Sequence, residues 1–198
     1  MPIKHFDSNR VVFINLTEMD KYDGPEGNLS GGGSFVDENQ YAYEMFNFRN
    51  VDGQYYGYTP PHGNLNIDRI PGSKDFDKHG KYIEDVLVVF TCYRAYIGRI
   101  ICGFYLHSRV YEHPIFTTMP SRYFKIHGED LYAEYNIICK AEDATLIDRD
   151  DRWKRLPIAS RDGIGHGQSA HWYVDTPERQ SLKNDLLDYI EQVIQQKS

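Results

Sequence analysis

Two apolar runs on either side of a short polar segment constrain the fold more than any other feature. Residues 86–90 read VLVVF, and residues 100–106 read IICGFYL. Short runs rich in β-branched and aromatic residues are typical of strands buried on both faces. The connecting residues 93–98 end in glycine, which favours a hairpin. We therefore expect a hairpin over Asp85–Tyr111 at the centre of a β-rich domain.

Shorter strand patterns surround this hairpin and are separated by glycine and proline turn signals. The expected strands are residues 10–16, 41–48, 54–58, 65–70, 122–126, 132–139 and 144–147. The stretch 41–48, YAYEMFNF, slips out of alternation once, which predicts a bulge. Residues 17–34 and 73–81 are polar or charged and predict surface loops.

One amphipathic helix is expected near the end of the chain. Thr176 is a favourable N-cap, and Pro177 is a favourable first helical residue. Apolar residues then recur at helical spacing, at Leu182, Leu186, Leu187, Ile190, Val193 and Ile194. We expect a helix over about 176–195 that lays this stripe on a core formed by residues 10–175. The predicted fold class is α+β, mainly β: a mostly antiparallel sheet, curled or closed into a barrel, in a single domain over residues 1–198.

Charge and cysteine content narrow the possible functions. The net charge is −7, which counts against gripping long nucleic acid by its phosphates but not against a pocket that reads one base. The three cysteines are scattered in apolar runs, which argues against a disulfide framework or a zinc site. We expect buried thiols in a cytoplasmic protein. No apolar run is long enough for a membrane span or a secretory signal, so no membrane partner is expected.

The glycine-rich stretch 163–173, GIGHGQSAHWY, holds the first group of candidate binding residues. Glycines let the backbone approach a ligand closely. Gln168 and Ser169 offer donors and acceptors for the edge of a base. Trp172 and Tyr173 offer faces on which a base could stack. The alternative is that Trp172 only plugs one end of the sheet.

A second group of candidates is the aromatic cluster of residues 46–58. Alternation along a strand places Tyr56 and Tyr58 on one face and Tyr55 on the other. One set is expected to be core, and the other could line a pocket together with Phe48.

Patterns for catalysis or metal binding are weak. His166 and His171 are five residues apart, without a ligand motif around them. The acidic residues Asp148, Asp150 and Asp151 could hold Mg²⁺ as in a nuclease, or form a solvated loop. We predict no catalytic residue, no metal site and no cofactor, and keep a small metal-dependent nuclease or nucleotide hydrolase as an alternative.

Five stretches, taken together and in this order, resemble a known family: residues 31–48, 53–70, 85–92, 100–111 and 163–173. They resemble a bacterial domain often found ahead of HNH-type and other restriction-type nuclease modules. That domain is similar in outline to the PUA-like superfamily, whose EVE, YTH and ASCH members are curled β-barrels. These members accept a nucleobase, often a modified one, in an aromatic-lined pocket. The resemblance implies a nuclease domain or subunit as a partner. No nuclease motif follows the expected helix, so the chain would stand alone or be the reader portion of a longer protein.

The hypothesis from these observations is a module that reads a flipped or single-stranded, modified base, in DNA rather than RNA, in restriction or antiviral defence. The residues expected to hold the base are Trp172, Tyr173, Gln168, Ser169, Phe48, Tyr56 and Tyr58. Arg69 and Arg109 are expected to contact phosphates. The alternatives are the nuclease or hydrolase named above and a sensor of free nucleotides.

Overall fold

The computed structural model describes residues 5–25, 41–60, 63–157, 165–167 and 169–197. The strands are β1 (Val11–Leu16), β2 (Gln54–Gly57), β3 (Asp75–Asp77), β4 (Gly80–Arg94), β5 (Gly98–Ile115), β6 (Tyr123–Ile126), β7 (Glu129–Tyr132), β8 (Tyr135–Lys140), β9 (Ala144–Leu146) and β10 (His171–Tyr173). One long helix, α2 (Pro177–Lys197), follows them. Short 3₁₀ turns are η1 (Tyr43–Phe46), η2 (Ile67–Arg69), η3 (Pro120–Arg122), η4 (Ala141–Asp143) and η5 (Arg149–Asp151).

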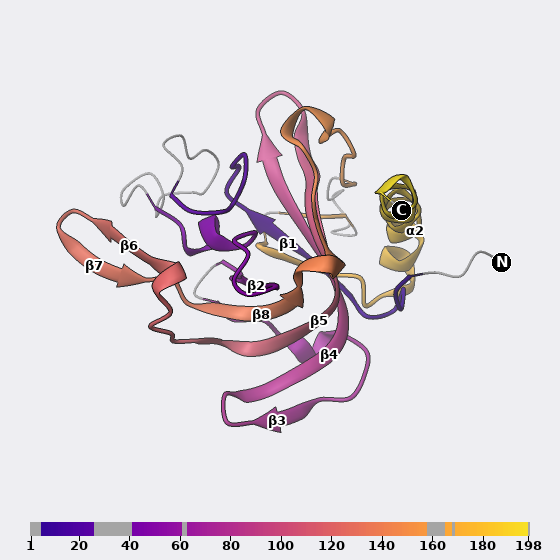
Figure 1. Ribbon diagram of the computed structural model, residues 1–198. Coiled ribbons are helices and arrows are strands. Elements are labelled where there is room, and N and C mark those ends of the chain that lie inside the picture. Colours follow the sequence, from indigo (N-terminus) through magenta and orange to yellow (C-terminus); the bar gives the residue numbers. More distant parts are fainter. Residues whose placement is uncertain (1–4, 26–40, 61–62, 158–164, 168, 198) are drawn as a thin grey trace.

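Eight strands form one mixed sheet in the order β10-β1-β4-β5-β8-β2, with β3 beside β4 and β9 beside β5. The hairpin of β4 and β5 lies at its centre, which confirms the prediction from the two apolar runs. Both strands are long and bent (Figure 1), and their register shifts at several points. The sheet is open, because its path ends at β10 and β2. The fold is therefore mainly β with a terminal helix, and the alternative of a closed barrel is not what forms.

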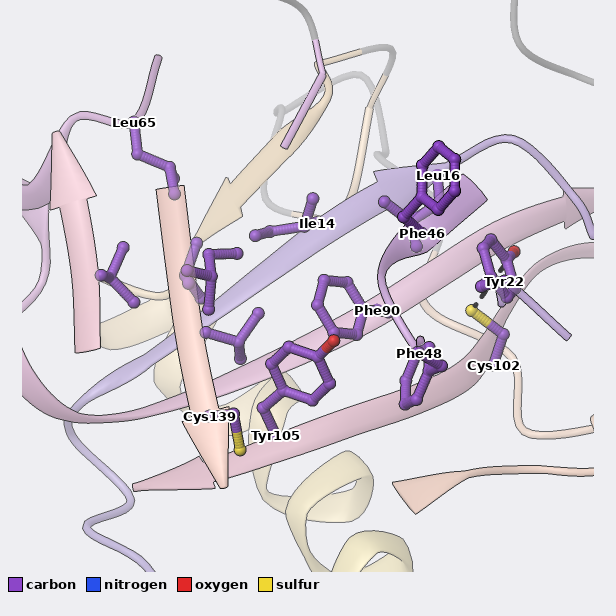
Figure 2. Close-up of a cluster of buried hydrophobic side chains, with 14 of the residues drawn as sticks. Ile14, Leu16, Tyr22, Phe46, Phe48, Leu65, Phe90, Cys102, Tyr105 and Cys139 are labelled. Carbon is purple, nitrogen blue, oxygen red and sulfur yellow. Dashed lines mark hydrogen bonds between the residues drawn. The ribbon is translucent and has the colours of Figure 1, made fainter. Parts of the chain in front are cut away.

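The central strands are buried on both faces, which explains their continuous apolar runs. Phe90 of β4 and Tyr105 of β5 point into one core (Figure 2). Val88 of β4 belongs to the same buried cluster. Leu87 and Val89 point the other way, into a second core beneath α2. That second core contains the helix residues Leu186, Leu187 and Ile190 and the strand residues Phe13, Phe104 and Trp172.

Two buried arginines fasten loops to the sheet through backbone carbonyls. Arg122 donates to the carbonyl oxygens of Ala133, Tyr56 and Glu134 at 2.6–2.7 Å. Arg152 donates in the same way to those of Ile147, Met19 and Asp20 at 2.6–2.7 Å. A planar guanidinium can serve three carbonyls at once because its donors fan out in one plane.

The small hairpin of β6 and β7 forms a sheet of its own beside the main one (Figure 1). Phe124 of β6 packs on Tyr41, 5.3 Å between ring centroids, and on Phe46, 5.9 Å. Aromatic contacts of Phe124 and the hydrogen bonds of Arg122 at its base thus hold this hairpin against the main sheet.

Two predicted strands are wrong. Residues 41–48 contain the 3₁₀ turn η1 instead of a strand, and Glu44, Met45 and Phe46 of this turn are all buried. The Asn47 side chain there makes the hydrogen bonds that a strand neighbour would make: it accepts from the Tyr58 amide and donates to the Tyr58 carbonyl. Residues 65–70 likewise contain the 3₁₀ turn η2.

One predicted loop is also wrong, because part of 73–81 forms strand β3 against β4. The predicted helix is confirmed and runs to Lys197. Within the described residues, none of the helices combines the length and apolar character that crossing a membrane requires.

Candidate functional site

The indole of Trp172, predicted to floor a base pocket, lies in the interior of the protein. It is 3% exposed, and its ring centroid is 5.0 Å from that of Phe13. Leu186 and Ile190 of α2 belong to the same buried cluster. In this conformation no face of the indole is open to a base, so the alternative, that Trp172 plugs the sheet, describes it better.

Phe48 and Tyr58 are core residues as well. Each is 7% exposed. Phe48 makes edge contacts with Phe90 at 5.6 Å and Tyr105 at 5.2 Å, and Tyr58 makes one with Tyr43 at 5.3 Å. Each ring packs on other buried or partly buried aromatic rings, so the expectation that Phe48 and Tyr58 line a pocket is corrected to a role in the core.

Tyr173 and Arg69 lie together, but they contact each other through a cation–π interaction. The guanidinium carbon of Arg69 lies 4.4 Å from the Tyr173 ring centroid. Arg69 Nε also donates to Asp175 Oδ2 at 2.7 Å, which corrects its predicted role as a phosphate contact because the charge is already paired. Ser169 is exposed, and its Oγ accepts from the His171 amide. Gln168 lies outside the described residues.

Tyr56 and Arg109 are predicted residues that the fold places in one row across three strands, both partly exposed. Tyr56 of β2 pairs with Ile138 of β8, and Ile138 pairs with Arg109 of β5. Their chain neighbours Ile137 and Val110 point into the first core, so this row of three points to the opposite, outer face. All three side chains are partly exposed.

A second tyrosine extends this row across β4. The Arg109 guanidinium carbon lies 4.5 Å from the ring centroid of Tyr82, which is also partly exposed. We call Tyr56, Tyr82, Arg109 and Ile138 the tyrosine–arginine face. Tyr56, Tyr82 and Ile138 are partly buried and pack on a cluster of Tyr111, Ile115 and Tyr135, which contains no residue of α2. The helix packs on the other apolar cluster of the sheet.

The charges on this face are already balanced. Arg109 Nε donates to Glu84 Oε1 at 2.7 Å, and Nη1 lies 3.4 Å from Asp77 Oδ2. The Tyr111 hydroxyl donates to Asp77 at 2.7 Å, and this bond is the main reason that the pKa of Asp77 is lowered. Two carboxylates thus hold the guanidinium against Tyr82. Arg109 therefore serves as a fixed flat surface, which corrects its predicted role as a free phosphate contact.

Sequence reasoning missed a half-buried arginine at the start of β5. Arg99 Nε donates to Asn15 Oδ1 at 2.9 Å, and Nη1 lies 2.6 Å from His166 Nδ1 and bonds to the Gly167 carbonyl. Burial lowers the pKa of Arg99. Burial, and then the charge of Arg99, lower the pKa of His166 to about 4. A lone Arg beside an apolar run gave no signal for this cluster.

No group of three or more His, Cys, Asp or Glu side chains in the part of the chain that the structure describes is arranged to hold a metal ion. Asp150 and Asp151 lie in η5 and are exposed, and the neighbouring Arg149 pairs with Asp20 at 2.8 Å.

No protein-family model matches the chain, and searches among curated proteins and among solved structures found no match either. The likeness to the PUA-like superfamily therefore stays a prediction, and function has to be inferred from the residues themselves.

Proposed function

We propose that this protein binds single-stranded nucleic acid on the tyrosine–arginine face, with bases stacked on Tyr56 and Tyr82. The observation that carries this proposal is the register across β2, β8 and β5. It aligns Tyr56, Ile138 and Arg109 in one row, over an apolar cluster that contains no residue of α2. Aromatic side chains on an open sheet are a common stacking surface for bases, and stacking contributes about 1–3 kcal/mol per base.

Polar groups beside Tyr56 add contacts for base edges and phosphate. The Tyr56 hydroxyl donates to Gln54 Oε1 at 2.8 Å, which holds the Gln54 amide beside the ring. Gln54 is exposed, so its NH₂ group can donate to the acceptors of a base. Lys140 lies opposite Gln54 in the ladder, and its side chain is 69% exposed. Its Nζ lies 3.5 Å from Glu142 Oε1, and an ion pair this exposed contributes little, so a phosphate can replace Glu142.

Stacking explains why an acidic protein could bind nucleic acid. With a net charge of −7 and Arg109 paired to carboxylates, electrostatic attraction to the backbone contributes little. Binding then depends on unpaired bases, whose faces are accessible, and a duplex is a poor ligand. Preference for a modified base, which the family resemblance predicts, would add about 1–3 kcal/mol for a methyl-sized group that fits the surface.

The test is fluorescence anisotropy with labelled eight-nucleotide DNA and RNA strands, with the matching duplex as a comparison. Tyr56→Ala and Tyr82→Ala should each weaken single-strand binding by about 5- to 100-fold, the equivalent of one lost stacking contact. Tyr123→Ala is the matched control, since this tyrosine is 40% exposed on the separate β6–β7 hairpin. A panel with modified bases in the same strand tests the predicted preference.

The proposal fails if neither tyrosine variant changes the affinity while circular dichroism shows that both are folded. It also fails if the wild-type chain binds duplex as well as single strands, because stacked bases in a duplex cannot reach Tyr56 or Tyr82.

A further inference from the structure

We infer that Arg99 and His166 form a second binding site, separate from the tyrosine–arginine face, for an oxyanion of the phosphate type. The first ground is an unbalanced charge. Arg99 is held by a side-chain amide, an imidazole and a backbone carbonyl, none of which is negative. No carboxylate of the described residues pairs with it. Removing a cation from water is unfavourable unless an anion or a full set of acceptors replaces the water.

The other arginines of the chain differ from Arg99 in the partners of their guanidinium groups. Arg69 and Arg109 pair with carboxylates. Arg122 and Arg152 are more deeply buried, but each serves three carbonyl oxygens. Arg99 also has three neutral acceptors, but all of them bond to Nε and Nη1. Unlike Arg122 and Arg152, it therefore has one terminal nitrogen, Nη2, without an acceptor among the described residues.

Counting donors leaves part of Arg99 unused. A guanidinium has five N–H groups. Nε bonds to Asn15, and Nη1 bonds to His166 and Gly167. Across the described residues nothing accepts from Nη2, which leaves two N–H groups available. An oxyanion can accept both in the forked geometry that arginine favours.

His166 holds the Arg99 guanidinium in place through its ring. Its Nδ1 lies 2.6 Å from Arg99 Nη1 and 3.0 Å from the Gly167 carbonyl oxygen. Because arginine can only donate, Nδ1 accepts from Arg99 in this arrangement, and the proton of the neutral ring lies on Nε2. Nε2 is buried without a partner among the described residues and points away from Arg99 across the ring, so Nη2 of Arg99 holds the anion and His166 orients the guanidinium.

Backbone hydrogen bonds join three segments around the cluster. Asn15 of β1 donates its amide to the Ala170 carbonyl at 2.8 Å. Leu156 donates to the Arg99 carbonyl at 2.9 Å, and His166 donates to the Pro157 carbonyl at 2.9 Å. The Arg99 side chain is therefore anchored before any ligand arrives, which lowers the entropy cost of binding.

The test measures thermal unfolding of the full chain with increasing inorganic phosphate, against chloride at the same ionic strength. Phosphate should raise the midpoint temperature of the wild type beyond the effect of chloride. In Arg99→Gln the phosphate affinity should fall by about 10- to 100-fold, the equivalent of losing charge-assisted hydrogen bonds. Arg69→Gln is the matched control, because Arg69 is already paired with Asp175.

Nitrogen NMR of the imidazole gives a readout in the wild-type chain, with His166→Gln used only to assign the signals. Because Nδ1 of His166 bonds to Arg99, phosphate should shift the imidazole nitrogen resonances that disappear in His166→Gln and leave the other histidines unchanged. The site is refuted if phosphate stabilises the wild type no more than chloride does. The site is also refuted if Arg99→Gln and Arg69→Gln lower the phosphate affinity by the same factor. That result would mean that phosphate acts on the overall charge of the protein and not at Arg99.

The source of the phosphate is separated by comparing inorganic phosphate, a nucleoside monophosphate and an eight-nucleotide strand. If Arg99→Gln weakens strand binding as well, the site holds a backbone phosphate. If Arg99→Gln loses binding only of inorganic phosphate and the nucleoside monophosphate, the site serves a free phosphate. These results are independent of the tyrosine variants, so failure of one proposal leaves the other intact.

Discussion

Two histidines near β10 make stability depend on pH. Burial lowers the pKa of His166 and that of His171 to about 4, below the ordinary value of 6.5. The unfolded chain therefore takes up protons first as pH falls. The contribution of neutral histidine is fully present above about pH 6.5 and is lost as pH falls toward 4.

We predict that the free energy of unfolding falls by about 1–2 kcal/mol for each of these histidines between pH 7 and pH 5. Urea denaturation in chloride buffer measures it. Replacing both with Gln should flatten the profile in this range, whereas His113→Gln, at an exposed position, should leave it unchanged. An unaltered profile in the double variant would show that other groups control the acid limb.

The buried hydroxyl of Tyr105 in the first core destabilises the fold because it has no hydrogen-bond partner among the described residues. The side chain is fully buried beside Phe90 (Figure 2), and no described residue accepts or donates at its oxygen. Burial raises the pKa of Tyr105 well above its ordinary value, so the group stays neutral. We predict that Tyr105→Phe stabilises the fold by about 1 kcal/mol, measured by urea denaturation. A loss of stability would instead mean that an internal water bonds to this hydroxyl.

Among the elements, α2 depends on the indole that it covers. Because Trp172 fills the space between Phe13 and the helix, we predict that Trp172→Ala lowers the free energy of unfolding by about 3–5 kcal/mol. Trp172→Phe keeps a ring there and should cost less. The affinity of the folded Trp172→Phe variant for single-stranded nucleic acid should equal that of the wild type. If the folded variant no longer bound nucleic acid, the indole would have to be part of the binding site.

The elements also show what sequence can and cannot reveal. Hairpin, first strand and terminal helix follow from local patterns, because apolar runs and helical spacing report burial directly. The turn at 43–46 does not, because its aromatic residues pack on Tyr58 and Phe124, which lie outside the turn in sequence. The same limit applies to Trp172: an aromatic residue beside glycines looks alike whether it faces a ligand or a helix.

Only part of the candidate site could be predicted from the sequence, for a similar reason. Tyr56 and Arg109 were singled out separately, and their alignment depends on the pairing of β2, β8 and β5. Neither the carboxylates that neutralise Arg109 nor the charge imbalance at Arg99 can be read from spacing along the chain. Such pairings join residues distant in sequence, so they emerge only with the tertiary fold.

At the scale of the whole molecule, net charge sets how binding responds to salt. Few cations lie free on the tyrosine–arginine face of this acidic protein, so few counterions are released when a strand binds. We predict a slope of log affinity against log salt no steeper than about −2, from one to three phosphate contacts. Anisotropy titrations between 50 and 300 mM NaCl, roughly the usual range for such slopes, measure it. A slope steeper than about −4 would indicate a basic track elsewhere on the surface.

Strand β1 lies between two partners from very different parts of the chain: β4 in parallel, and β10, which begins only at His171. During synthesis, the second edge of β1 stays uncovered until the chain has been made as far as β10. Such distant pairings close slowly. Until then the uncovered edge of Val11–Leu16 can pair with a strand of another molecule. By covering this edge, β10 also prevents aggregation of newly made chains.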